Sequence, residues 1–239
     1  VNIDDKNGNY MVQNSNAKIC SYALKSNADF SLKIFEKDFN GMKMFINGFE
    51  VWTKLIGEFN AYNILATYSL AKAYDLIEDK ILNNISALET VEGRFEKISK
   101  NGISKIGIVD YAHSPDSIKK ILQTLNELKA KDEFLITVIG CGGDRDKLKR
   151  PEMLKVALEY GREVIFTSDN SRSEDFNDIL SDAIRGNDNN KVTAIEDRKR
   201  AIMKGAELIK DNDCLVILGK GHEETQEIKN SIIHFSDHE

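Results

Sequence analysis

Strands and helices alternate strictly through the second half of the chain, and this alternation constrains its fold more than any other feature. Short apolar runs typical of buried strands recur between stretches whose apolar residues follow the helical period of about 3.6 residues. The expected strands cover residues 106–110, 134–139, 163–168, 191–195 and 213–218. One expected helix begins at Pro115, and the other three cover residues 151–160, 174–185 and 197–210. The pattern predicts a mostly parallel, Rossmann-like α/β sheet with right-handed crossovers and helices on both faces. A closing hairpin is expected at 226–235, with Lys229 and Asn230 at its turn.

The first 92 residues follow a different pattern. Strand-like residues from 20 to 55 are interrupted at Asn40-Gly41 and Asn47-Gly48, which predict two-residue hairpin turns with positive φ at both central residues. Helical periodicity then covers residues 58–76 and 78–88. We therefore expect two domains, residues 1–92 and residues 93–239.

Composition excludes several classes of function. The chain has 239 residues and a net charge of −6, whereas nucleic-acid binding favours a basic face, so no nucleic-acid partner is expected. Its three cysteines are too widely spaced for a disulfide framework or a metal motif, which favours a reducing, cytoplasmic setting. No apolar run approaches the ~20 residues that span a bilayer, so no membrane partner is expected either. The chain begins at Val1 rather than Met, and we expect a further segment upstream.

Four polar loops follow four of the expected strands. They are Asp110–His113, Gly140–Arg150, Asp169–Arg172 and Gly219–Glu223. Because the carboxyl ends of parallel strands meet at one edge of a sheet, these loops should gather there, where open α/β sheets bind their ligands. Glycines in the second loop permit close backbone approach to a ligand, and its charged side chains can hold carboxylates and phosphates. The sequence therefore predicts a binding site at this edge.

Individual residues in these loops also have structural interpretations. The alternatives are Asp110 as a helix cap, although Ser114 is nearer; His113 as a structural histidine; Arg145 as a partner of Asp144 or Asp146; Asp169 and Asn170 as turn formers; and Glu223 as a solvated or capping residue. Arg172 is harder to explain structurally, because arginine is suited to bidentate recognition of carboxylates. The Gly140-Cys141-Gly142 sequence is not a dinucleotide fingerprint, since the third glycine is missing, and this disfavours a nicotinamide oxidoreductase.

The loops, in this order, resemble those of the Mur ligases, ATP-dependent amide-forming enzymes of peptidoglycan precursor synthesis. The similarity is greatest to the MurE type, which adds a diamino acid to UDP-N-acetylmuramoyl-L-alanyl-D-glutamate, and it covers essentially the whole chain. Residues 57–63 resemble the segment that closes the family's mixed α/β central ATP-binding domain, and residues 93–96 resemble the hinge into its C-terminal domain. Residues 110–115, 140–150 and 219–223 are similar to family signatures.

The resemblance implies roles for particular residues. It places Asn60 and Asn63 near adenine, and Arg94, Asp110, Tyr111 and His113 at the ribose and phosphates. It assigns the diamino acid to Arg145, Asp169, Asn170, Arg172, Gly219 and Glu223. Arg172 could bind a distal carboxylate while Glu223 and the Gly219 carbonyl accept from the distal ammonium. Two departures from the family pattern occur nearby: Ser171 stands where proline is usual, and Leu148 where glycine is common.

The sequence contains no Gly-x-x-x-x-Gly-Lys-Ser/Thr phosphate loop. In the family this loop, the magnesium ligands and the domain that binds the UDP sugar lie upstream of a segment like residues 1–5. The resemblance thus implies that residues 1–92 are the C-terminal part of the central domain and that residues 93–239 are the complete amino-acid-binding domain. ATP and Mg²⁺ are the implied cofactors, with no metal ligand or catalytic residue in this chain, which alone should be inactive.

The function expected for the whole protein is ligation of a diamino acid, meso-diaminopimelate or a near-isostere, to the UDP-muramoyl dipeptide through an acyl phosphate. A lysine-adding or cyanophycin-type ligase is an alternative within the same chemistry. A non-catalytic module that binds a nucleotide or an amino acid is an alternative from another class, favoured by the missing phosphate loop.

Overall fold

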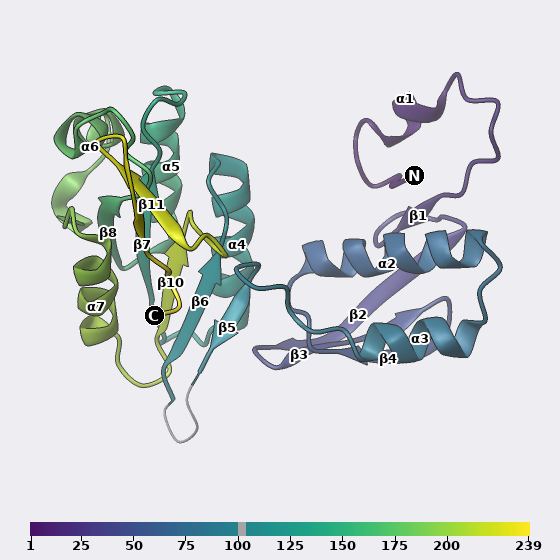
Figure 1. The fold of residues 1–239 in the computed structure, drawn as a ribbon. Coiled ribbons are helices and arrows are strands. Elements are labelled where there is room, and N and C mark those ends of the chain that lie inside the picture. Colours follow the sequence, from purple (N-terminus) through teal and green to yellow (C-terminus); the bar gives the residue numbers. More distant parts are fainter. Residues whose placement is uncertain (100–103) are drawn as a thin grey trace. The chain divides into compact units, whose positions relative to one another are not determined.

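The computed structural model describes residues 1–99 and 104–239. The chain forms two compact units, Val1–Thr90 and Val91–Glu239. Each unit has its own sheet and its own covering helices (Figure 1). Across these described ranges, no helix is both long enough and apolar enough to cross a membrane.

The first unit is a four-stranded sheet covered by two helices. The strands β1 (Tyr22–Ala23), β2 (Phe30–Asp38), β3 (Gly41–Ile46) and β4 (Phe49–Thr53) lie in sequence order, and α1 (Gly8–Val12), α2 (Glu58–Ala73) and α3 (Glu78–Ser86) complete the unit. Alternate residues of β3, such as Met42 and Met44, are buried and pack in one core with Ile64 and Leu65 of α2. This alternation is expected when one face of an antiparallel sheet is covered and the other is open.

Both predicted hairpins form, but the first turn lies one residue earlier in the chain than predicted. Asn47 and Gly48 both have positive φ, 47° and 90°, as a two-residue hairpin turn requires. Asn40, in contrast, is outside the left-handed region, and Gly41 already pairs with Asp38 in the ladder. Gly41 is needed for another reason: a Cβ there would lie 2.0 Å from the Thr53 carbonyl oxygen. The glycine thus allows the backbone of β4 to lie close to the start of β3.

The second unit contains a six-stranded sheet in the order β5-β6-β10-β7-β8-β9. Its strands are β5 (Glu96–Ile98), β6 (Ile106–Asp110), β7 (Leu135–Cys141), β8 (Glu163–Ser168), β9 (Val192–Ala194) and β10 (Cys214–Leu218), and its helices are α4 (Pro115–Leu128), α5 (Lys149–Tyr160), α6 (Phe176–Ile184), the short η1 (Asn189–Lys191) and α7 (Arg198–Leu208). All neighbours except β5 and β6 run parallel, which confirms the predicted sheet. The antiparallel edge strand β5 was not predicted, because three residues are too few to show a period.

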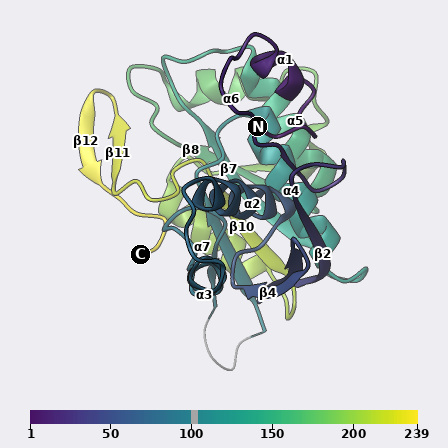
Figure 2. The same ribbon diagram turned by 90° about the vertical axis from the view of Figure 1, so that its right-hand side faces the viewer.

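Helices cover both faces of this sheet (Figures 1 and 2). Helices α4, α5 and α6 pack side by side, whereas α7 packs on β7, β8 and β10. Beneath α7, Ala201 contacts a core that includes Val138 and Ile165. Because every residue of β7 and β10 is buried, these strands read as continuous apolar runs rather than alternating ones.

The strand order decides which loops become neighbours. Strand β10 lies between β6 and β7, although it is the last strand of the sheet in the sequence. The loops that follow β6, β10, β7 and β8 therefore succeed one another along a single edge. The hairpin of β11 (Thr225–Ile228) and β12 (Ser231–His234) forms as predicted, and its turn residues Lys229 and Asn230 have φ of 49° and 61°.

Candidate functional site

A cavity of about 390 Å³ lies at the carboxyl edge of the six-stranded sheet, and all four predicted loops contribute to it. The six residues expected to bind a diamino acid all line it, as do two of those expected near the nucleotide: Arg145, Asp169, Asn170, Arg172, Gly219, Glu223, Tyr111 and His113. The structure thus brings these residues together. Their individual roles remain predictions.

The loop after β7 crosses closely over the loop after β8. The Gly143 N–H donates to the Asn170 carbonyl at 2.9 Å, and a Cβ on Gly143 would lie 1.9 Å from the Ser171 carbonyl oxygen. Asp144 accepts hydrogen bonds from the backbone N–H and hydroxyl of Ser173, at 3.2 and 2.7 Å. The Asp144 carboxylate is therefore hydrogen-bonded to Ser173. The exposed Arg145 lines the cavity and, among the described residues, forms no ion pair with Asp144.

Buried Arg150 ties the two loops to the helix layer. Its guanidinium donates to both carboxylate oxygens of Glu174, at 2.7 and 3.0 Å, to Asp182 at 2.9 Å and to the Gly142 carbonyl at 3.1 Å. The hydrogen bond from Arg150 is the main cause that lowers the pKa of Glu174 to about 2. The sequence indicated a charged loop here, but a buried arginine at its end is visible only once α6 packs beside α5.

Arg172 is oriented by the backbone around it. Its φ of 52° turns the chain, and its N–H donates to the Glu227 carbonyl at 3.0 Å. The Nη1 atom donates to the carbonyls of Gly143 and Asn170, at 2.7 and 3.3 Å, while Nε lies 3.5 Å from the Glu227 carboxylate. Ser171, in the place of the usual proline, is buried and does not displace the arginine from the cavity wall.

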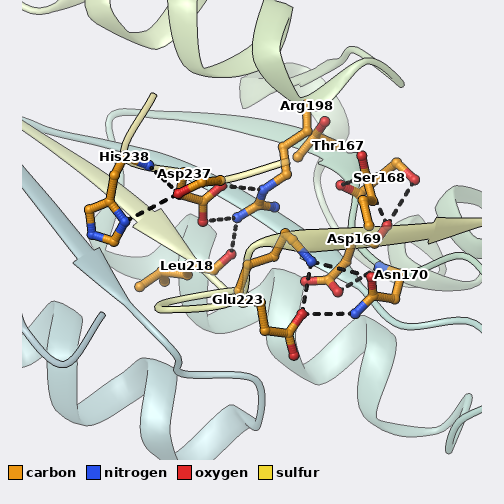
Figure 3. Close-up of polar contacts among 12 residues, drawn as sticks. Thr167, Ser168, Asp169, Asn170, Arg198, Leu218, Glu223, Asp237 and His238 are labelled. Atoms are coloured by element: carbon orange, nitrogen blue, oxygen red, sulfur yellow. Dashed lines mark hydrogen bonds and ion pairs between the residues drawn. The ribbon is translucent and has the colours of Figure 1, made fainter. Parts of the chain in front are cut away.

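Glu223 belongs to a polar cluster with the loop after β8 (Figure 3). Its Oε2 accepts from Asn170 Nδ2 at 3.0 Å and from Lys220 Nζ at 2.8 Å. Burial opposes ionisation of Glu223, but the hydrogen bonds from Lys220 and Asn170 outweigh it and leave its pKa below the ordinary value. Gly219 has a φ of 119°, and a Cβ there would lie 2.4 Å from Asp169 Oδ2. Lys220 was not among the predicted site residues, since a lysine between two glycines looks solvated in sequence.

The residues predicted near the ribose and phosphates form a second group. The Arg94 guanidinium lies over the Tyr111 ring, 4.6 Å from its centre, and the His113 ring packs edge-on against the same tyrosine. His113 Nδ1 also hydrogen-bonds the Tyr111 carbonyl at 2.9 Å. The exposed Arg94 guanidinium beside an aromatic ring fits an anionic nucleotide.

Asp110 is buried behind this surface. Its two carboxylate oxygens accept from the backbone N–H groups of Phe95 and Ala112, both at 2.7 Å. Burial raises its pKa despite these bonds. Ser114, not Asp110, caps α4 through a capping box with Ser117. Asp110 thus holds the turn that carries Arg94.

Asn60 and Asn63 lie in the first unit, near the start of α2. Asn60 Nδ2 donates to the Ile56 carbonyl at 2.8 Å, and Asn63 Nδ2 donates to Asn60 Oδ1 at 3.3 Å. Asn63 is exposed. Neither side chain is buried, so both amides can exchange these contacts for a ligand.

Among residues 1–99 and 104–239, no three histidine, cysteine, aspartate or glutamate side chains form a group that could hold a metal ion.

Both units match known protein families. The second unit matches the Mur ligase, glutamate ligase domain over residues 93–221, and the first matches the Mur ligase middle domain over residues 1–71. The chain is 42% identical to a UDP-N-acetylmuramoyl-L-alanyl-D-glutamate–2,6-diaminopimelate ligase of Cytophaga hutchinsonii, over 99% of this chain and 49% of the relative. The ligase of the same name from Parabacteroides distasonis is 43% identical, over 100% of this chain and 49% of the relative.

A solved structure of a 2,6-diaminopimelate ligase is also similar. It has a TM-score of 0.67 and 33% identity, and the match covers 99% of this chain and 50% of the solved one. The chain spans about half the length of the curated relatives it matches. Since one family model alone covers more than half of its residues, the chain belongs to the Mur ligase family.

Proposed function

We propose that this chain is the C-terminal part of an ATP-dependent ligase that adds a diamino acid to UDP-N-acetylmuramoyl-L-alanyl-D-glutamate. The observation that carries the proposal is that Arg172 and Glu223, of opposite charge, line one cavity of about 390 Å³. Such a cavity suits a small zwitterion held by its distal end. The names of the relatives, 2,6-diaminopimelate ligases, support the same substrate class.

Arg172 and Glu223 both hydrogen-bond Asn170, so they are near enough to bind the ammonium and the carboxylate that share the distal carbon of a diamino diacid. Arg172 donates to the distal carboxylate, and Glu223 together with the Gly219 carbonyl accepts from the distal ammonium. Lysine lacks this carboxylate, so its binding would leave Arg172 without that partner. The difference is on the order of 1.5–3 kcal/mol, the contribution of a hydrogen bond to a charged group. The preferred substrate is therefore meso-diaminopimelate or a near-isostere.

In the proposed reaction ATP phosphorylates the D-glutamyl carboxylate, and the amine of the diamino acid attacks the resulting acyl phosphate. A tetrahedral intermediate forms, and phosphate leaves. The residues of this chain position the reactants and neutralise charge rather than form covalent bonds. We assign Arg94, Tyr111 and His113 to the ribose and phosphates. Asp110 acts behind them by holding the Phe95 turn.

The nucleotide assignment extends to the first unit, where Asn60 and Asn63 would contact adenine. ATP and Mg²⁺ are proposed for the whole protein, and the metal ligands are assigned to the part of it outside this chain. The proposed setting is the cytoplasm, where the nucleotide substrates are made.

The substrate is tested by calorimetry on the 239-residue chain with meso-diaminopimelate, lanthionine and lysine. We expect binding of the two diacids and binding of lysine that is about tenfold or more weaker. Arg172→Ala should abolish the difference between diacid and lysine. Arg200→Ala removes an exposed arginine of α7 outside the cavity lining and is the control. Equal binding of lysine and the diacids by the unaltered chain would contradict the assignment.

Steady-state kinetics on the complete enzyme test the role in catalysis. Arg172→Ala should raise the KM of the diamino acid about tenfold or more and leave the KM of ATP nearly unchanged. Equal increases in both would show that Arg172 acts on the fold of the site rather than on the diamino acid.

A further inference from the structure

A fully buried lysine lies behind the cavity. The Lys220 side chain has no exposed surface, and it is not part of the cavity lining. Its ammonium lies 2.8 Å from Glu223 Oε2 and 3.2 Å from Asn170 Oδ1. A buried ammonium is costly unless it is paired and hydrogen-bonded. Both of its partners line the cavity, so Lys220 acts on the site without reaching it.

Lys220 also balances a concentration of negative charge. Glu223, Asp169 and Asp237 lie close together, with buried Arg198 pairing Asp237 at 2.7 Å (Figure 3). Arg198 also interacts electrostatically with Asp169 and Glu223. Arg198 pairs with Asp237 and Lys220 pairs with Glu223, so each of these two carboxylates has a buried cation beside it. Without Lys220, the hydrogen-bond partner left to Glu223 among the described residues would be the neutral Asn170.

The two oxygens of Glu223 are used differently. Oε2 accepts from both Lys220 and Asn170. Oε1 has no hydrogen-bond partner among the described residues and belongs to a side chain that lines the cavity. Lys220 thus holds the rear oxygen, and the front oxygen is available to a ligand.

We propose that Lys220 is a positioning residue, whose ammonium keeps Glu223 ionised and turns its Oε1 toward the ligand's ammonium. The ligand part of this inference rests on the proposed function. The part that concerns the ionisation of Glu223 does not, because it can be measured without any ligand.

The charged and polar groups that face Glu223 come from three elements. They are Lys220 and His222 from its own loop, Asp169 and Asn170 from the loop after β8, and Arg198 from α7. Of these, Lys220 is the cation in direct contact with the Glu223 carboxylate. Its removal should therefore change the titration of Glu223 more than removal of the others.

The first test is a carbon-13 NMR titration of the glutamate carboxyl groups in the ligand-free 239-residue chain, with the Glu223 signal assigned from Glu223→Gln. In Lys220→Met the titration midpoint of Glu223 should rise by about one pH unit or more, because an opposite charge is lost. Lys220→Arg, which keeps the positive charge, should leave the titration midpoint of Glu223 close to that of the unaltered chain. An unchanged midpoint in a folded Lys220→Met chain would overturn the proposal.

The second test is binding of meso-diaminopimelate between pH 5.5 and 8. The unaltered chain should bind almost equally across this range. Lys220→Met should bind more weakly at the acid end than at the basic end and recover as the pH rises, since a raised pKa leaves part of Glu223 protonated at low pH. A uniform loss at every pH would indicate a merely structural lysine. If the unaltered chain binds no diamino acid, the proposed function fails while the titration still decides the role of Lys220.

A double variant covers the case in which Lys220→Met does not fold. Lys220→Met combined with Glu223→Gln removes both charges and should fold. If Lys220 acts only through Glu223, the affinity of the double variant for meso-diaminopimelate should lie within about twofold of that of Glu223→Gln alone. The reason is that the effects of two coupled residues do not add. A further large loss in the double variant would overturn the proposal.

Discussion

Arg150 and Arg185 both pair with Asp182, at 2.9 and 3.0 Å, but their environments differ. The Arg150 side chain is 2% exposed and the Arg185 side chain is 77% exposed. Replacing Arg150 by methionine removes the buried partner of the half-buried Glu174 and Asp182 and should lower the free energy of unfolding by about 1.5–3 kcal/mol, the contribution of hydrogen bonds to charged groups. Arg185→Ala, the matched control, should cost about 1 kcal/mol or less. Urea denaturation of the two variants checks this, and similar losses in both would contradict the importance of burial.

The carboxyl group of Glu174 makes the stability of the second unit sensitive to acid. Its pKa falls from the ordinary 4.5 to about 2, chiefly through the hydrogen bond from Arg150. A depressed carboxyl pKa stabilises the fold above the unfolded value, and this stabilisation is lost as the pH falls from 4.5 toward 2. Unfolding measured across this window should show the loss in the unaltered chain and a smaller loss in Glu174→Gln. Identical pH dependence of the two proteins would show that Glu174 does not contribute to the acid sensitivity of the fold.

At the scale of elements, the site depends on two loops that cross with almost no space between them. A Cβ at Gly143 would lie 1.9 Å from the Ser171 carbonyl oxygen, so Gly143→Ala must separate the loops after β7 and β8. We expect binding of the diamino acid to weaken about tenfold or more, since a displacement near 1 Å is costly in a positioned site. Gly107→Ala in β6 is the control, because its Cβ would meet nothing closer than 3.5 Å. Calorimetry on both variants compares them, and equal affinities would exclude loop crossing as a requirement.

At the scale of the whole molecule, the cavity is built from residues of the second unit alone. Binding of meso-diaminopimelate should therefore protect amides of the loops after β7, β8 and β10 from hydrogen exchange. Amides of β2, β3 and β4 should exchange as before. Hydrogen exchange with mass spectrometry resolves these segments. Protection confined to the first unit would place the ligand elsewhere.

The absence of a phosphate loop from the sequence leads to a second prediction for the whole molecule. The 239-residue chain should bind the diamino acid but should release no phosphate from ATP, whereas the complete enzyme should do both. A phosphate-release assay with all substrates distinguishes the two proteins. Turnover by the chain alone would show that the phosphates are held by a loop of another kind.

Much of the fold of the second unit could be predicted because its signals are local. Strand β6 and the first residue of α4 lie where the apolar run and Pro115 placed them, and the ends of β8 agree as well. The predicted helix of residues 58–76 instead ends at Ala73, because Asp75 adopts a φ of 56°. Strand β5 was missed, since its edge position comes from pairing with β6 and not from its own residues.

By itself, the sequence determined the alternation of strands and helices, the gathering of four loops at one sheet edge and the types of side chain those loops carry. These follow from periodicity and from the geometry of parallel strands, which each segment expresses alone. Only the tertiary structure decided that Lys220 and Arg150 are buried, that Asp144 pairs with Ser173 and that Gly143 lies against Ser171. These contacts join residues far apart in the chain, and burial of a charge depends on partners that no local pattern contains.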